Sequence, residues 1–303
     1  MGQIREKYKK VLITGAHSFI GQSFEEWVYA NFPSDIAVNV QDMHGDTWKK
    51  KDFSGYDALI HVAGIAHVDV GKISADDKTE YFKVNRDLVI ETAKKARKEG
   101  VKQFIFLSSI LVYGDAASNG HRRRLKADDI PGPKSIYGES KLQAEKGILE
   151  LENEEFHVAI VRLPMVYGAG CKGNFPKLER FATKLPFFPN VHNERSVIYI
   201  DNLSEFLAQL VMHEGKGLYF PQNPEYISTS ELIKTIAYVK GHNLFVSRLF
   251  NFVPFICSCI PGRVSAVCKK AFGSISYEMK MSDCGFAYQL FDLRTSIERM
   301  AEK

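Results

Sequence analysis

The sequence lacks an apolar run that is long enough to cross a membrane. A spanning helix needs about 18 to 20 apolar residues. The nearest candidate, residues 249–260, contains Pro254 and is followed by Pro261 and Gly262. The first ten residues are polar and basic, unlike a secretory signal. The sequence therefore predicts no membrane span and a cytoplasmic location.

Clustered metal ligands and strong net charge are also missing. The five cysteines have no histidine partners at the spacing of a zinc site, so we expect reduced thiols and no metal. A net charge of +4 over 303 residues is too small to indicate nucleic-acid binding. The most basic run, residues 121–124, is interpreted as a solvated loop. The composition, 45% hydrophobic and 25% charged, is that of a globular protein with one large or two ordinary domains.

A glycine-containing turn follows the first predicted strand. Residues 10–14 form a short apolar strand, and a helical pattern begins at Gln22. Strand, glycine turn and helix in this order are typical of a dinucleotide-binding site, in which helix amides face the pyrophosphate. Ser18 occupies the position where a middle glycine is usual, and its hydroxymethyl group narrows the approach of the pyrophosphate. The turn is Gly15–Ala16–His17–Ser18–Phe19–Ile20–Gly21.

Two further strands extend the predicted cofactor site. The second strand, residues 36–40, ends near Asp42. An acidic side chain there accepts from the ribose of NAD and repels the 2′-phosphate of NADP, although a simple turn aspartate is an equal alternative. The third strand, residues 56–64, ends in Val62–Ala63–Gly64, whose small size lets a cofactor lie against the backbone. NAD is therefore preferred and NADP stays possible.

A serine and a tyrosine–lysine pair are the candidate catalytic residues. Ser109 follows the strand at residues 101–107, and ligands bind beyond the carboxyl ends of strands in such sheets. The alternative for this residue is a capping serine. Tyr137 and Lys141 are four residues apart in a predicted helix, so they share one face. An ammonium nearby favours the phenolate, so we expect Lys141 to lower the pKa of Tyr137 and allow proton exchange near neutral pH.

Five motifs in order carry a family resemblance. Together they resemble the extended short-chain dehydrogenase/reductase family, and more narrowly the NAD-dependent epimerase/dehydratase group that acts on nucleotide-diphosphate sugars. The resemblance covers roughly residues 9–240. It implies a Rossmann-type, doubly wound parallel α/β sheet with a smaller C-terminal substrate-binding lobe. The motifs are Thr14–Gly15–x–x–Ser18–Phe19–Ile20–Gly21, His61–Val62–Ala63–Gly64, Ser109–x–x–Val112–Tyr113–Gly114, Tyr137–x–x–x–Lys141 and Arg162–x–Pro164–x–Val166–Tyr167–Gly168.

The resemblance also implies roles for single residues. Tyr137 corresponds to the acid or base that exchanges a proton with a sugar oxygen, Lys141 to the residue that holds the nicotinamide ribose, and Ser109 to the serine that bonds the reacting oxygen. Implied cofactor-binding residues are Gly15, Ser18, Phe19, Ile20, Gly21, Asp42, Val62, Ala63, Gly64, Lys141, Pro164 and Val166. Implied substrate-binding residues are Ser109, Tyr137, Asn174 and Arg195.

Arg195 is the implied clamp for the substrate diphosphate, because a guanidinium can bind it in a bidentate manner. The alternative is an ion pair with Glu194 or Asp201. Residues 1–163 are expected to form the NAD(P)-binding domain. Residues 164–303 are expected to form mainly the substrate lobe, with some return to the first domain.

Three functions stay open. A reductase of 6-deoxy-4-keto-hexosamine nucleotides in polysaccharide synthesis is slightly preferred to a UDP-sugar 4-epimerase like UDP-glucose 4-epimerase. Dehydration is disfavoured, because Ser109 is followed by Ile110 and Leu111 rather than by an acidic pair. A non-catalytic regulatory protein that binds a dinucleotide is the third possibility, encouraged by Ser18 and opposed by the intact catalytic set. A homodimer is possible. The apolar segment 244–260 is interpreted as lobe core, with a substrate flap or a surface for membrane-bound partners as alternatives.

Overall fold

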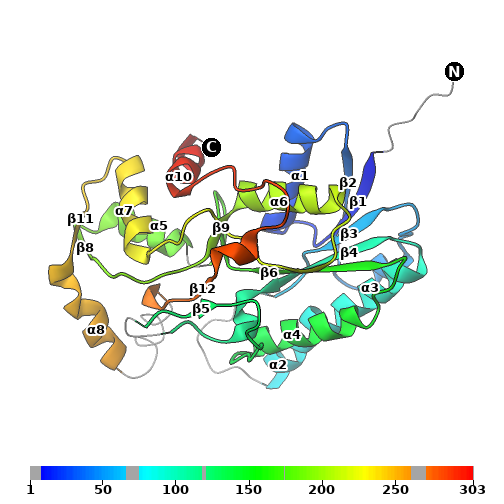
Figure 1. The fold of residues 1–303 in the computed structure, drawn as a ribbon, viewed down its shortest axis with the longest axis horizontal. Helices are drawn as coiled ribbons and strands as arrows, with labels where there is room; N and C mark the ends of the chain where they lie inside the picture. The colour runs from blue at the N-terminus through cyan, green and yellow to red at the C-terminus, as the bar shows by residue number, and fades with distance from the viewer. Residues whose placement is uncertain (1–7, 66–74, 118–120, 174, 261–270, 303) are drawn as a thin grey trace.

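A computed structural model describes residues 8–65, 75–117, 121–173, 175–260 and 271–302. Its centre is a six-stranded parallel sheet with helices on both faces and a smaller lobe at one end (Figure 1). This confirms the predicted α/β fold class. The sheet strands are β1 (Lys9–Thr14), β2 (Ile36–Gln41), β3 (Ala58–His61), β4 (Gln103–Ser109), β6 (His157–Leu163) and β10 (Gly217–Tyr219).

Alternation along each strand divides the core into two layers. Residues 11 and 13 of β1 pack in the same cluster as α1 (Phe19–Asn31) and α6 (Ile200–Met212), whereas Leu12 packs in the cluster of the opposite face. That second face is covered by α3 (Leu88–Lys98) and α4 (Ile136–Leu149). Both faces of the central strands are therefore apolar, as parallel sheets require. Gly100 follows the end of α3 with a φ of +84°, a conformation that glycine commonly adopts after a helix.

The strand order is β10-β6-β4-β3-β1-β2. The direction in which successive strands are added reverses at β1, because β2 lies on one side of it and β3 on the other. The crevice for a ligand therefore lies beyond the carboxyl ends of β1 and β3. The Rossmann order 3-2-1-4-5-6 has one more strand outside the second one. Within the described ranges that strand is not present, and β2 forms the edge of the sheet. Only the short helical turn η1 (Thr47–Lys50) lies between β2 and β3.

The smaller lobe is built from the later part of the chain, while β10 returns to the main sheet beside β6. Three small two-stranded sheets connect its segments. The strand β12 pairs with β5, a segment that precedes α4 in the chain, so the lobe is tied to the nucleotide-binding half. The lobe elements and their partners are β5 (Arg124–Leu125), β7 (Met165–Tyr167), α5 (Phe175–Lys184), β8 (Phe187–Pro189), β9 (Val197–Tyr199), α7 (Thr229–Val239), β11 (Phe245–Ser247), α8 (Phe252–Cys259), β12 (Ser276–Tyr277) and α10 (Leu293–Glu302).

The apolar segment at 244–260 forms lobe core only at its start, where Leu244 and Val246 pack against the main hydrophobic cluster. Leu249, Phe252 and Ile256 are each more than half exposed. Apolar composition alone does not tell which side of a short helix faces protein, and α8 lies at the outer end of the lobe (Figure 1). Among the described residues, no helix is long and apolar enough to cross a bilayer.

Candidate functional site

The turn after β1 is held against the end of β3. Gly15 has a φ of +98°, and a Cβ there would lie 2.9 Å from the backbone nitrogen of Ala63. The amides of Val62 and Ala63 both donate to the carbonyl of Thr14 at 3.1 Å. Only glycine fits this position without strain, because the backbone conformation and the close neighbour both exclude a side chain.

Ser18 lies immediately before α1 and caps the N-terminus of this helix. Its Oγ accepts a hydrogen bond of 3.1 Å from the amide of Gly21, so it is the N-cap of the helix. The amides of Phe19 and Ile20 precede that bond and have no acceptor within the helix. The departure from glycine therefore leaves two helix amides available for an anion at the end of the sheet.

We expect Gly15→Ala to destabilise the fold by about 1–3 kcal/mol and to weaken dinucleotide binding, because a side chain at this φ is strained and would press on Ala63. Urea unfolding and titration with NADH measure both effects. Gly45→Ala is the matched control, since Gly45 also has a positive φ, +65°, but no atom lies within 4 Å of its virtual Cβ. Unchanged NADH affinity in Gly15→Ala would contradict the assigned place of the turn.

Asp42 directly follows the edge strand β2 and is exposed. Its Oδ1 accepts from the amide of His44 at 3.0 Å and lies 2.7 Å from the Nδ1 of the same histidine. Hydrogen bonding to His44 lowers the pKa of this carboxyl. Asp42 therefore closes a turn, which is the alternative considered for it, and its carboxylate lies directly after the strand. Its contact with a cofactor ribose stays a prediction.

Asn85 fixes the backbone beyond β3. It lies in a π-helical turn, Lys83–Asp87, between α2 (Ala75–Phe82) and α3. Its amide group bonds both the N–H and the C=O of Ile65, at 2.8 and 2.9 Å, and lies 3.3 Å from the hydroxyl of Ser140. The buried Asn85 side chain therefore links Ile65, the residue after Gly64, to Ser140 on α4. Such π-helical turns occur frequently at functional sites.

Tyr137 and Ser109 meet at the carboxyl edge of the sheet. Ser109 ends β4, and its Oγ accepts from the amide of Leu111 at 3.2 Å, so it also caps the next helical turn, η3 (Ile110–Tyr113). Burial raises the pKa of Tyr137 to about 12, while a hydrogen bond with Ser109 acts in the opposite direction. The expected lowering of this pKa by Lys141 is wrong, because burial raises the pKa, the Tyr81 phenol also raises it when ionised, and the hydrogen bond with Ser109 lowers it by less.

Lys141 points beneath the site rather than into solvent. Its ammonium donates to the carbonyl of Leu107 at 2.9 Å and lies 4.6 Å from the centre of the Phe106 ring. A Cβ on Gly64 would lie 3.3 Å from the Nζ of Lys141, so the amine lies beside the chain just after β3. Burial lowers its pKa to about 8. Lys141 is thus charged at neutral pH and can lose its proton in the mildly alkaline range.

Replacing Lys141 tests this shift through stability. The unfolded lysine keeps its proton up to about pH 10.4, whereas the folded one loses it near pH 8. Between these values the unfolded state binds more protons, so the wild type gains stability as pH rises. We expect its free energy of unfolding to rise by about 3 kcal/mol relative to Lys141→Met across that window. Denaturant unfolding at several pH values measures the difference. A difference in the free energy of unfolding that does not change with pH would show that burial does not lower the pKa of Lys141.

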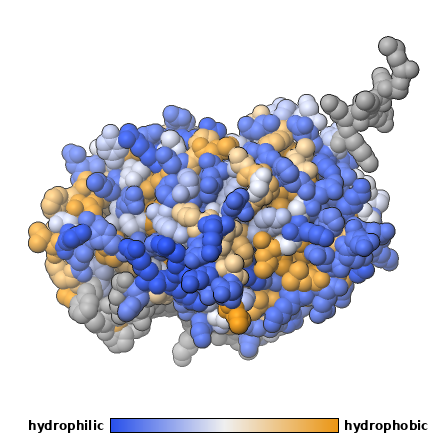
Figure 2. Space-filling view, in the orientation of Figure 1, coloured by the Kyte–Doolittle hydropathy of each residue, from blue (hydrophilic) through white to orange (hydrophobic). Residues whose placement is uncertain are grey.

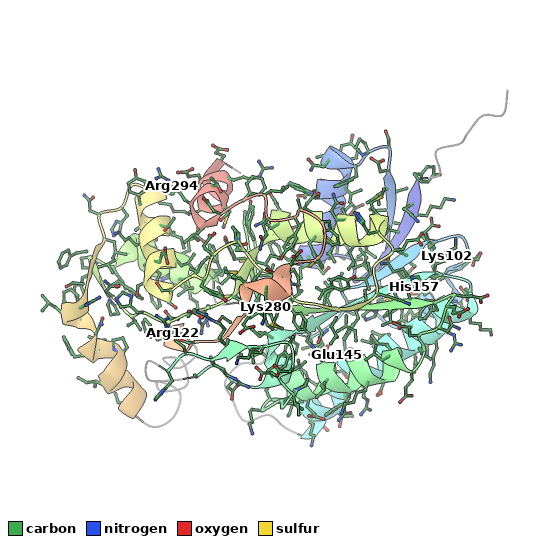
Figure 3. The ribbon with its side chains drawn as sticks, in the orientation of Figure 1. Lys102, Arg122, Glu145, His157, Lys280 and Arg294 are labelled. Atoms are coloured by element: carbon green, nitrogen blue, oxygen red, sulfur yellow. The ribbon has the colours of Figure 1, made fainter. Side chains whose placement is uncertain are left out.

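A buried ion pair lies one helical turn beyond Lys141. Glu145 accepts from Arg162 on β6 through both oxygens, with the closest nitrogen–oxygen distance 2.6 Å, and also bonds the hydroxyl of Ser108. Figure 3 shows Glu145 on α4. Arg162 donates to the hydroxyl of Tyr113 at 2.7 Å. Glu145 was not among the predicted site residues, although its position four residues after Lys141 places it on the same helix face.

Arg195, one of the predicted substrate residues, lies in the later part of the chain that builds the small lobe. Arg195 is largely buried, its Nε donates to the carbonyl of Gly273 at 2.8 Å, and burial lowers its pKa to about 10. Glu194, one of the two partners considered for Arg195 in the alternative, forms a bidentate pair with Arg124, at 3.0 and 2.8 Å. Asp201 pairs with Arg299 at 2.8 Å. Asn174 lies outside the described residues.

The basic run 121–124 is only partly the solvated loop we expected. Arg122 is exposed. Arg123 donates to the carbonyls of Tyr113 and Asp115. Arg124 belongs to β5, beside the strand that contains Tyr277. The Tyr113 and Tyr277 rings lie 6.3 Å apart, so this basic segment borders the turn that follows Ser109.

A separate cavity of about 590 Å³ lies away from these residues. It is lined by Lys9, Asp57, Lys102 and His157, which belong to the amino ends of the strands or immediately precede them. Figure 3 shows Lys102 and His157 at the right of the molecule, with Lys280 near its middle and Arg122 further to the left. The catalytic candidates instead gather at the carboxyl edge, where Pro164 follows Leu163, the register partner of Ser109. Val166 lies two residues further, in β7.

The residues at this edge fit a dinucleotide. The contact of Gly15 with Ala63 leaves no room for a side chain, and the amides of Phe19 and Ile20 begin a helix at the same edge. The buried ammonium of Lys141 and the phenol of Tyr137 follow on the next helix, α4. When bound, a nicotinamide cofactor would supply hydride transfer, which no protein side chain provides.

Comparison with known proteins gives the same class. Residues 11–217 match the family described as NAD dependent epimerase/dehydratase family. The chain belongs to this family, and it is an NAD(P)-dependent enzyme of the extended short-chain dehydrogenase/reductase type, in the nucleotide-sugar epimerase and reductase class.

Two curated relatives act as 4-epimerases by name. The chain is 30% identical to a UDP-glucose 4-epimerase of Vibrio cholerae over 253 residues, which cover 77% of this chain and 76% of the relative. It is 26% identical to an N-acetyl-alpha-D-glucosaminyl-diphospho-ditrans,octacis-undecaprenol 4-epimerase of Escherichia coli O157:H7, over 68% of this chain and 64% of the relative.

Two solved structures share the fold along nearly the whole chain. MoeE5 in complex with UDP-glucose and NAD superposes with a TM-score of 0.69 at 20% identity, over 97% of this chain and 99% of MoeE5. The dTDP-4-dehydrorhamnose reductase of Bacillus anthracis in complex with NADP superposes with a TM-score of 0.71 at 19% identity, with the same coverage. The neighbours therefore bind either form of the cofactor.

Proposed function

We propose that this protein acts at C4 of a nucleotide-diphosphate sugar, as a reductase of a 4-keto-6-deoxy-hexosamine in polysaccharide synthesis. The observation that carries the proposal is the position of Tyr137, hydrogen-bonded to Ser109 and one turn from the buried ammonium of Lys141 at the carboxyl edge of the sheet. A phenol with a pKa of about 12 is protonated at neutral pH and is ready to donate. Reduction of a ketone needs such a donor, since the new alkoxide must receive a proton.

The proposed roles follow from chemistry at each atom. The hydroxyl of Ser109 bonds the reacting oxygen and aligns it with the phenol of Tyr137, which donates its proton to that oxygen. The ammonium of Lys141 is proposed to hold the cofactor ribose. Asn174 and Arg195 are proposed to hold the substrate, with the guanidinium facing the diphosphate. Asp42 at the end of β2 is proposed to favour NAD over NADP.

A 4-epimerase is the alternative, and the 30% identity with the Vibrio cholerae enzyme supports it. Both chemistries use the same residues, because an epimerase removes and returns a proton at the same sugar oxygen. The name of the Escherichia coli relative describes a substrate whose sugar is linked through diphosphate to undecaprenol, so lipid-linked sugars are a further candidate substrate class. A non-catalytic regulatory role is less supported, because Ser18 caps α1 and leaves the amides of Phe19 and Ile20 in place.

Cellular context is also proposed rather than shown. The free thiols of Cys171 and Cys284 are those of a protein in a reducing compartment, and we propose the cytoplasm. We further propose a homodimer that forms through the helix containing Tyr137.

The test is to extract freshly purified protein and to analyse the released dinucleotide. A reductase should be purified largely without cofactor and should oxidise added NADH or NADPH only when a 4-keto nucleotide sugar is present. Tightly retained NAD together with interconversion of UDP-glucose and UDP-galactose would establish the epimerase instead. A protein that binds no dinucleotide and converts neither substrate would overturn both.

A further inference from the structure

Helix α8 exposes an apolar stripe at the end of the small lobe. Leu249, Phe252, Val253, Ile256 and Ile260 follow one another at intervals of one, three or four residues, so they lie near one face of the helix and its ends. Each of them is between 40% and 76% exposed. Single exposed apolar residues are ordinary on a protein surface, whereas a contiguous group of this kind indicates a binding surface.

The neighbouring strands enlarge this group. Phe187 of β8 and Phe245 of β11 are 48% and 61% exposed. Both rings pack against Phe250, with centroid distances of 4.4 and 6.3 Å, which joins the strands to the turn before α8. Figure 2 shows hydrophobic residues gathered at the left end of the molecule, where Figure 1 places α8 and β11. We call the set Phe187, Phe245, Leu249, Phe252, Val253, Ile256 and Ile260 the apolar end.

Cationic side chains border the apolar end. Lys184 and Arg248 are both exposed there. The described residues 241–260 contain Arg248 and no aspartate or glutamate. An anionic lipid surface attracts such a segment. A protein partner would need its own acidic and apolar groups in a matching arrangement.

The shape agrees with a helix that lies on a membrane rather than through it. α8 has eight residues, far fewer than the roughly 20 that span a bilayer. Interfacial helices combine aromatic and aliphatic side chains on one face with flanking cations, and they insert only to the level of the headgroups. From these observations we propose that the apolar end is a docking surface for an anionic lipid bilayer.

The proposal goes beyond the catalytic assignment and does not depend on it. Docking through α8 would place the small lobe against the bilayer, because the paired strands β8 and β11, which contain Phe187 and Phe245, belong to that lobe. The Rossmann sheet lies at the other end of the molecule (Figure 1). The protein would then meet the membrane with its substrate-binding lobe and leave the cofactor-binding half towards the aqueous side.

Vesicle flotation of the full chain tests the proposal. We expect the protein to float with vesicles of phosphatidylethanolamine and phosphatidylglycerol at low salt, and much less with vesicles of phosphatidylcholine alone. Phe252→Ser and Ile256→Ser should each weaken binding roughly tenfold, because each removes one inserting apolar side chain. The matched controls Tyr29→Ser and Ile130→Ser replace residues that are 84% and 88% exposed outside the apolar end, and they should bind like the wild type.

Other outcomes overturn the proposal. A wild-type protein that stays in the dense fraction with phosphatidylglycerol vesicles at low salt would exclude membrane docking. So would equal flotation of the Phe252→Ser/Ile256→Ser double variant and the wild type. A third result would identify the surface as an interface between copies of the chain. In that case neither protein binds vesicles, and light scattering shows that the wild type is a dimer and the double variant a monomer. Thermal unfolding of each variant verifies that the loss does not come from misfolding.

Discussion

Tyr137→Phe should lower kcat by about 10²–10⁴-fold, the usual contribution of a positioned acid or base. The variant removes one oxygen and keeps the ring, so the fold and dinucleotide affinity should be unchanged. The loss should appear in kcat rather than in KM, because the phenol transfers its proton during the chemical step. Steady-state kinetics with a 4-keto nucleotide sugar and titration with NADH measure the two parts.

The matched control for this variant is Tyr81→Phe. Tyr81 lies on α2, is 5% exposed, and its hydroxyl is buried without a hydrogen-bond partner among the described residues. Its charge, when ionised, acts to raise the pKa of Tyr137, so the two phenols are near each other. Removing its hydroxyl should change kcat by only a few fold. A large loss in Tyr81→Phe with retained activity in Tyr137→Phe would transfer the acid role to the other tyrosine.

Glu145→Gln should destabilise the protein by about 3–5 kcal/mol, because it leaves the guanidinium of Arg162 buried without its counter-charge. The pair is bidentate, and the two side chains are only 7% and 2% exposed. The change should also move the alkaline limit of activity to lower pH, since Glu145 acts to raise the pKa of Lys141. Urea unfolding and a pH–rate profile measure the two effects.

A surface pair provides the comparison. Glu298 and Arg294 lie four residues apart on α10 at 2.9 Å, and both are largely exposed. Glu298→Gln should cost less than about 1 kcal/mol. The double variant Glu145→Leu/Arg162→Met should recover much of the stability lost in Glu145→Gln, because it removes both buried charges together. A cost below 1 kcal/mol for Glu145→Gln would show that Arg162 finds another partner or reaches water.

Local signals predicted much of the fold and of the catalytic edge. Gly15 and the apolar strand before it marked the turn, and both adopt the expected conformation. The spacing of Tyr137 and Lys141 placed them on one helix, and Ser135 caps that helix through the amide of Gly138. These features depend on neighbours within a few residues, which the sequence displays directly.

Burial and long-range pairing could not be obtained in this way. Lys141 is buried and Tyr137 is half-buried, and the loss of water around both side chains shifts their pKa values, so the one-turn spacing gave the wrong direction for the tyrosine. Glu145 and Arg162 lie on different elements, so their pairing depends on how α4 packs on β6. The apolar residues of α8 were assigned to the core because composition does not distinguish a buried face from an exposed one.

The edge position of β2 has a consequence for how the protein would share its cofactor with the cell. Asp42 ends this outermost strand and is exposed, so a dinucleotide held there would terminate at the rim of the sheet. Under the proposed reductase assignment, such an open end would let the oxidised cofactor leave after each turnover. The ratio of reduced to oxidised nicotinamide in the cell, rather than a permanently bound molecule, would then set the direction in which this protein works.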